Sequence, residues 1–131
     1  MSYEVYMMKT ASNQERDLSE IESVEPMPCW RELKMMLRCR FPDLISGYAQ
    51  LDDSMDFPVL SSPDYALEFN LAVDSEDEPL TGIMFGRPGS GDRWAYPLKF
   101  LCRLLDARIV DCGGGEFWDW DNLPDWIAEG L

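Results

Sequence analysis

Carboxylates are the side chains of this sequence that are most able to do chemistry. The chain has 25 Asp and Glu residues against 11 Lys and Arg residues. Close pairs such as Asp52/Asp53 and Asp119/Asp121 have the residue types for general acid–base catalysis or for binding Ca²⁺ or Mg²⁺. With so many acids, close pairs arise by chance, and solvated acidic loops explain them better. We therefore predict no catalytic residue, no metal site and no cofactor.

Nucleophilic catalysis is the class of reaction that the sequence disfavours most. The chain has no histidine, so a Ser-His or Cys-His pair cannot form. No CxxC pair is present, and Cys29, Cys39 and Cys102 fall on apolar helical positions, where a thiol usually acts as a small hydrophobe. Cys112 lies beside a glycine turn, and its acidic neighbours are expected to raise its pKa. We expect a protein that is not an enzyme.

One glycine-rich segment, Gly86–Asp92 (GRPGSGD), has the composition of a phosphate-binding loop. Its backbone N–H groups, with Arg87 and Arg93 nearby, would suit an anion at a helix start. However, it lacks the Lys-Ser/Thr pair of the P-loop and the spacing of the dinucleotide fingerprint. We interpret it as a flexible connection from a strand to a helix. A small-ligand-binding or enzymatic domain that uses this loop is kept as an alternative.

The C-terminal segment 111–131 (DCGGGEFWDWDNLPDWIAEGL) combines tryptophans with carboxylates. It holds six acids and no Lys or Arg, and three of the five tryptophans of the chain lie in its last fourteen residues. Aromatic rings surrounded by carboxylates are typical anchors for a basic protein partner, although the same alternation suits a strand with one buried face. The candidate partner-binding residues of this segment are Asp119, Asp121, Asp125 and Trp126.

The net charge of −14 limits the kinds of partner. Such a charge repels nucleic-acid phosphates and anionic membranes and steers basic proteins into contact. The sequence begins with no basic and apolar signal segment, and no stretch has the ~20 apolar residues of a membrane helix. We therefore expect a cytoplasmic protein with a basic protein partner that binds neither nucleic acid nor membrane.

The length of 131 residues predicts one domain, residues 1–131. Hydrophobic periodicity predicts four strands and two helices, in the order Ser2–Met8, helix Cys29–Phe41, Ala66–Asp74, Leu80–Gly86, helix Tyr96–Asp106 and Arg108–Cys112. This order is typical of the ferredoxin-like βαββαβ pattern, an α+β fold with two helices on one face of an antiparallel sheet. Glu116–Trp120 is predicted to return beside the last strand as an extra C-terminal edge strand.

This topology also groups the acids of the connections. The first two predicted strands run toward the same end of the sheet. The Thr10–Pro28 connection and the Ser75–Pro79 turn therefore lie together there, and they are here called the acidic pole. Its candidate partner-binding residues are Asp74, Glu76, Asp77 and Glu78. The sequence leaves open whether this pole or the C-terminal segment contacts the partner.

The second half of the chain resembles bacterial immunity proteins of polymorphic toxin systems, which accompany toxins of contact-dependent or type VI secretion pathways. The residues that carry the resemblance are a helix ending in LLDARIVD, a glycine turn and EFWDW, in a small acidic α+β protein. The resemblance implies a non-enzymatic inhibitor that binds a secreted toxin. A homodimerising adaptor domain that pairs through its edge strand is the remaining alternative.

Overall fold

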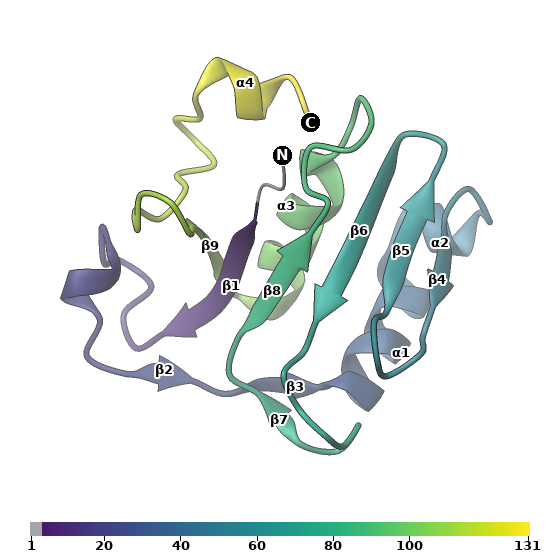
Figure 1. The fold of residues 1–131 in the computed structure, drawn as a ribbon, viewed down its shortest axis with the longest axis horizontal. Helices are drawn as coiled ribbons and strands as arrows, with labels where there is room; N and C mark the ends of the chain where they lie inside the picture. The colour runs from purple at the N-terminus through teal and green to yellow at the C-terminus, as the bar shows by residue number, and fades with distance from the viewer. Residues whose placement is uncertain (1–3) are drawn as a thin grey trace.

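The computed structural model describes residues 4–131, so Ser2 and Tyr3 of the first predicted strand lie outside the described residues. The protein is an α+β fold with an antiparallel sheet (Figure 1). The helices are α1 (Trp30–Arg40), α2 (Pro42–Ile45), α3 (Ala95–Leu105), α4 (Asp125–Ala128) and the 3₁₀ turn η1 (Leu18–Glu20). The strands are β1 (Val5–Thr10), β2 (Val24–Glu25), β3 (Met27–Cys29), β4 (Gln50–Asp52), β5 (Val59–Ser62), β6 (Tyr65–Asn70), β7 (Pro79–Leu80), β8 (Ile83–Gly86) and β9 (Arg108–Asp111).

β1 has a paired strand on each side, as its apolar residues on both faces predict, but it lies next to the edge strand β9 and not in the middle of the sheet. It pairs antiparallel with β8 on one edge and β9 on the other, so that Val5 lies opposite both Phe85 and Asp111. Val5 and Met7 are fully buried. The sheet continues from β8 through β6, β5 and β4, and β2 pairs with the end of β1.

The two longer helices form where the hydrophobic periodicity predicts them. α1 buries Trp30, Leu33 and Leu37 on one stripe, and Pro42 follows its last turn. α3 buries Leu98, Leu101 and Leu105 and ends at Asp106, which adopts a left-handed conformation with φ 51°. Asp is one of the few side chains that tolerates this conformation well, so the helix ends there.

Aromatic rings join α1 to the sheet. The Phe69 ring on β6 lies 5.6 Å from the Trp30 ring and 5.0 Å from the Phe85 ring, measured between centroids. All three side chains are fully buried. They belong to one hydrophobic cluster that includes residues of α1, α3 and the sheet.

The predicted C-terminal edge strand is wrong. Glu116–Trp120 forms only isolated bridges, which join Val110 to Phe117 and Asp17 to Glu116. The Phe117 N–H donates to the Arg16 carbonyl at 3.0 Å, whereas the Trp118 N–H donates to the Ile109 carbonyl at 2.9 Å. The segment therefore divides its hydrogen bonds between β9 and a loop, and no continuous ladder forms.

Additional strands form at the opposite edge of the sheet instead. For the segment between Pro42 and Tyr65, the prolines and acids predict an irregular, ordered loop that packs partly onto the domain, with a short helix as an option; the structure has the short helix α2 and also the strands β4 and β5. Leu60 of β5 is fully buried and lies opposite Leu67 of β6. Burial of this apolar strand outweighs the local turn signals. Among residues 4–131, no helix has both the length and the apolar character needed to cross a bilayer.

Replacing Phe69 tests the aromatic contact between α1 and the sheet. Phe69→Ala is expected to lower the free energy of unfolding by about 3–5 kcal/mol, because it leaves a cavity between two packed rings. Phe57→Ala removes the same side chain at a site that is 63% exposed, and should cost less than about 0.5 kcal/mol. Urea unfolding of both variants measures the difference, and similar losses would contradict the packing described.

Candidate partner-binding surface

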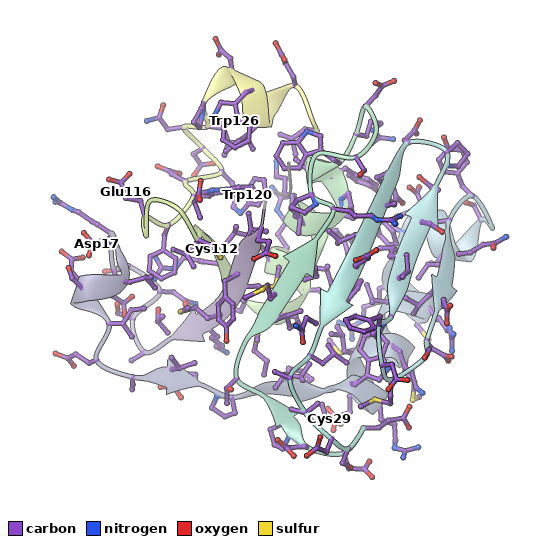
Figure 2. All side chains as sticks on the ribbon, viewed as in Figure 1. Asp17, Cys29, Cys112, Glu116, Trp120 and Trp126 are labelled. Atoms are coloured by element: carbon purple, nitrogen blue, oxygen red, sulfur yellow. The ribbon has the colours of Figure 1, made fainter. Side chains whose placement is uncertain are left out.

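The segment from Glu116 to Ile127, here called the tryptophan tail, covers the end of the sheet beside β9. It leaves β9 through the turn at Gly113–Gly115 and ends in the short helix α4 (Figure 1). Figure 2 shows Glu116 on the outer side of this segment, with Trp120 and Trp126 further along it. The tail thus places Glu116, Trp120 and Trp126 beyond the end of the last strand.

Four tryptophan side chains pack together beneath and within the tail. Trp94, at the start of α3, stacks on Trp126 with centroids 5.9 Å apart and planes inclined by 18°. Trp118 meets Trp94, Trp120 and Trp126 edge to face, at 6.1, 5.6 and 6.4 Å. These geometries suit the aromatic quadrupole and hold the exposed ring of Trp126 in one orientation.

The chain end fastens the tail to α3. Ile127 is buried, and the Ala95 N–H donates to the Gly130 carbonyl at 2.7 Å. A Cβ at Gly130 would lie only 2.4 Å from Nε1 of Trp94, so no larger residue fits without displacing the indole. Glycine at this position therefore allows the backbone to lie directly on the tryptophan cluster.

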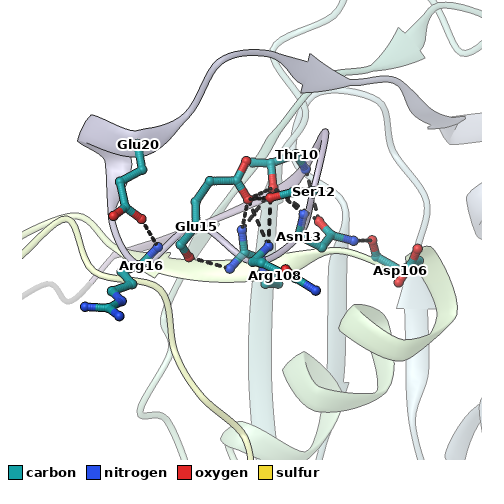
Figure 3. Close-up of polar contacts among 9 residues, drawn as sticks. Thr10, Ser12, Asn13, Glu15, Arg16, Glu20, Asp106 and Arg108 are labelled. Carbon is teal, nitrogen blue, oxygen red and sulfur yellow. Dashed lines mark hydrogen bonds and ion pairs between the residues drawn. The ribbon is translucent and has the colours of Figure 1, made fainter.

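A polar network on the other side of the tail links it to β1 and β9 (Figure 3). Arg108 donates from Nη2 to Glu15 Oε1 at 2.8 Å and to Thr10 Oγ1 at 2.9 Å, and from Nη1 to the Glu15 carbonyl at 2.7 Å. The Glu15 carboxylate also accepts from Ser12 Oγ at 2.7 Å and from the Gln14 N–H at 3.0 Å. Only 17% of the Arg108 side chain and 9% of the Glu15 side chain are exposed.

Hydrogen bonding and burial shift the pKa values of the two ionisable groups of this network, Glu15 and Arg108. The hydroxyl of Ser12, together with Thr10 and the backbone, lowers the pKa of Glu15 from 4.5 to about 2. Burial lowers the pKa of Arg108, although the Glu15 carboxylate opposes this shift. The Arg108 guanidinium also lies 3.9 Å from the centre of the Phe117 ring, which brings the first residues of the tail into the network.

The tail residues that the sequence predicts as contacts lie on the surface. Asp119, Asp121 and Asp125 are exposed, and within residues 4–131 none of them forms an ion pair. Trp126 is 49% exposed although its other face stacks on Trp94. Trp118 and Trp120 are only partly exposed and pack against the core.

The predicted contacts of the acidic turn have a different environment. Glu76 accepts from Lys34 at 2.7 Å and lies 3.3 Å from Arg31, and Asp77 pairs with Arg31 at 2.7 Å. The hydrogen bond from Arg31 lowers the pKa of Asp77. Asp74 and Glu78 remain exposed. The turn lies at the other end of the sheet from the tail (Figure 1), so the structure does not combine the two groups into one surface.

Two hollows flank the tail and share the wall formed by Phe117, Trp118 and Asp119. The larger, of about 550 Å³, lies between the tail and the loop after β1, and both Arg16 and Arg108 line it. The smaller, of about 300 Å³, lies between the glycine turn and α4. Within the described residues, no group of three or more His, Cys, Asp or Glu residues is arranged to hold a metal ion.

The other candidate groups take part in contacts within the protein itself. Arg87 pairs with Glu68 at 2.9 Å, and the Arg93 guanidinium lies 4.4 Å from the centre of the Tyr96 ring. Gly91, at φ +85°, approaches the Asp64 carbonyl so closely that a Cβ would lie 1.9 Å away.

The four cysteines are free thiols, and burial, with the nearby Glu4 and Asp111 charges, raises the pKa of Cys112.

Sequence patterns miss several residues that position the tail. Trp94 lies outside the C-terminal segment, and no spacing in the sequence predicts that it contacts the tail. The sequence predicts only that Arg108 lies on a strand, yet its guanidinium contacts both Glu15 in the loop after β1 and Phe117 of the tail. A partly buried arginine that pairs with an acid 93 positions away leaves no periodic signal in the sequence.

Comparisons with protein-family models, with curated proteins and with solved structures find no match for this chain. Function must therefore be inferred from the geometry and charge of the protein surface.

Replacing Glu15 tests the network that supports the tail. Because the folded-state pKa lies below the ordinary value of 4.5, ionised Glu15 stabilises the fold above pH about 4.5. This contribution is lost as the pH falls towards about 2, where the folded-state carboxyl protonates. Glu15→Gln should therefore lower the midpoint of thermal unfolding at pH 7 and have a much smaller effect near pH 2.

Glu22→Gln is the matched control for this experiment, since Glu22 is exposed on the same connection. It should leave the midpoint nearly unchanged at both pH values. A Glu15→Gln effect that is equally large at pH 7 and pH 2 would contradict a role for the ionised carboxylate.

Enlarging Gly130 tests how the tail is fastened. Gly130→Ala is expected to displace the chain end from Trp94, loosen the Trp94–Trp126 stack and shift tryptophan emission to longer wavelength. Gly114→Ala is the control, because a Cβ there meets nothing within 4 Å. Unchanged emission and unchanged acrylamide quenching in Gly130→Ala would show that the tail does not depend on this contact.

Proposed function

We propose that this protein is a cytoplasmic, non-enzymatic inhibitor of the immunity-protein type that binds and neutralises a basic toxin through the tryptophan tail. The observation that carries the proposal is the environment of Trp126. Its ring is half exposed yet fixed by Trp94 and Trp118, and Asp119, Asp121 and Asp125 lie on the same short segment. A rigid aromatic anchor loses little conformational entropy on binding, which is typical of interface hot spots.

Charge pairing supports the tail as the contact surface rather than the acidic turn. Arg31 and Lys34 of α1 already neutralise Glu76 and Asp77 of the turn. A partner that binds there must compete with these ion pairs. The three exposed aspartates of the tail have no such competition within residues 4–131, so they contribute more strongly to long-range attraction.

The fold proposed for this inhibitor is a ferredoxin-like βαββαβ core. The order β9-β1-β8-β6, with every adjacent pair antiparallel, supports it. α1 lies on the connection from β1 to β6, which also contains β2, β3, α2, β4 and β5, and α3 connects β8 to β9. Figure 1 draws both helices behind the sheet. In such a core the segment after the last strand is not part of the βαββαβ pattern, and in this protein that segment is the tail.

Charge reversal tests the contribution of the tail to association. Asp119→Lys with Asp121→Lys should slow association with a basic toxin, supplied as the product of the adjacent reading frame, by about tenfold or more at low salt. The wild-type rate should fall as salt is added. Stopped-flow tryptophan fluorescence measures both effects.

Asp74→Lys with Glu78→Lys is the matched control, because it changes the net charge equally at the other end of the sheet. It should slow association much less than the tail variant does. Equal slowing by the two variants would mean that only net charge matters, and rates that do not depend on ionic strength would contradict electrostatic steering.

A further inference from the structure

The smaller hollow beside the tail has walls of two chemical kinds. Three aromatic side chains, Phe117, Trp118 and Trp126, form its apolar part. Two exposed acidic residues, Glu116 and Asp119, supply the charge, and no Lys or Arg is among the described residues that line it. In a chain where six acids pair with bases elsewhere, this makes the smaller hollow attractive to cations.

The aromatic walls are set at nearly a right angle. The Trp118 and Trp126 rings have centroids 6.4 Å apart and planes inclined by 85°, so a group in the hollow can meet the face of one ring and the edge of the other. Trp94 stacks behind Trp126 and holds it in place. The faces of tryptophan rings attract cations through their quadrupole, and guanidinium groups stack on them readily.

The carboxylates around the hollow suit an extended cation rather than a metal ion. Asp111, Glu116 and Asp119 do not converge into a group that could hold a metal. A guanidinium, in contrast, is planar and carries five N–H donors that can reach separate carboxylates. The volume of about 300 Å³ is at the lower end for small-molecule sites and accommodates one long side chain.

The larger hollow does not have the same selectivity. Arg16 and Arg108 line it, and Arg108 already pairs with Glu15 and lies over the Phe117 ring. Its charged lining is therefore mixed, whereas the charged residues that line the smaller hollow within residues 4–131 are all acidic.

We propose that the smaller hollow binds an arginine side chain of the basic partner, with the guanidinium against Trp118 and Trp126 and within reach of Glu116 and Asp119. This inference rests on the proposed function, because it names the group of the partner that the tail recognises. It makes recognition specific for arginine over lysine, which carries the same charge but cannot stack a planar group.

Titration with short peptides tests the site without a toxin. Hexa-arginine and hexa-lysine are added to the protein at 150 mM salt, and binding is followed by tryptophan fluorescence and calorimetry. Hexa-arginine should bind about tenfold more tightly than hexa-lysine. Glu116→Gln with Asp119→Asn should weaken hexa-arginine binding by about tenfold. The Asp119→Asn change keeps a side-chain oxygen that can accept from the Asp121 N–H, as the carboxylate of Asp119 does.

Asp74→Asn with Glu78→Gln removes the same charge at the acidic turn and should change the dissociation constant less than about twofold. Circular dichroism and thermal unfolding of each variant establish that the fold is retained. Equal binding of the two peptides, or equal weakening by the two double variants, would overturn the arginine site in favour of non-specific attraction.

Toxin binding by the same variants distinguishes failure of the arginine site from failure of the proposed function. If a basic toxin binds wild type and Glu116→Gln/Asp119→Asn equally well, the inhibitor function stands and the arginine site is wrong. If hexa-arginine requires the hollow but the toxin does not bind, the arginine site stands and the inhibitor function is wrong.

Discussion

One interaction, the pairing of Arg108 with Glu15, joins three parts of the chain on which the surface depends. The guanidinium emerges from the start of β9, binds the carboxylate and carbonyl of Glu15 in the loop after β1, and lies against the Phe117 ring of the tail. A largely buried charge is costly unless it is paired and hydrogen-bonded, and this geometry supplies both the partner and the bonds. The tail is consequently held on two sides, by Arg108 at its beginning and by Trp94 near its end.

The same pairing principle explains how the surface charge is distributed. The bases of α1 neutralise acids of two loops. Arg31 and Lys34 bind Glu76, which follows β6, and Arg38 binds Asp53, which follows β4. Much of the positive charge of the protein is therefore used within the fold. The tail contains no base of its own, and within residues 4–131 its aspartates form no ion pair and lie on the same short segment as the packed tryptophans. The positions of the few bases, more than the number of acids, therefore decide which acids form ion pairs among the described residues.

The sequence predicts the elements whose signals are local. Hydrophobic periodicity predicts the stripes of α1 and α3 and the pairing of β1 on both sides, because burial of an apolar face is visible in the residue spacing. Contacts between distant segments leave no such pattern. The alternation in Glu116–Trp120 predicts a strand, but hydrogen bonds to Arg16 and Ile109 divide the segment between two partners. Composition alone points to Asp119, Asp121, Asp125 and Trp126 as surface contacts, whereas Trp94, which fixes Trp126, is found only through the fold.

We propose that the tryptophan tail, and not the acidic turn, contacts a basic protein partner. Hydrogen–deuterium exchange of the protein alone and in complex with the basic toxin tests it most directly, because the two surfaces lie on separate peptides and at opposite ends of the sheet. Binding at the tail should slow exchange in residues 116–127 and leave exchange in residues 74–79 nearly unchanged. Slower exchange confined to residues 74–79, with an unaffected tail, would contradict it.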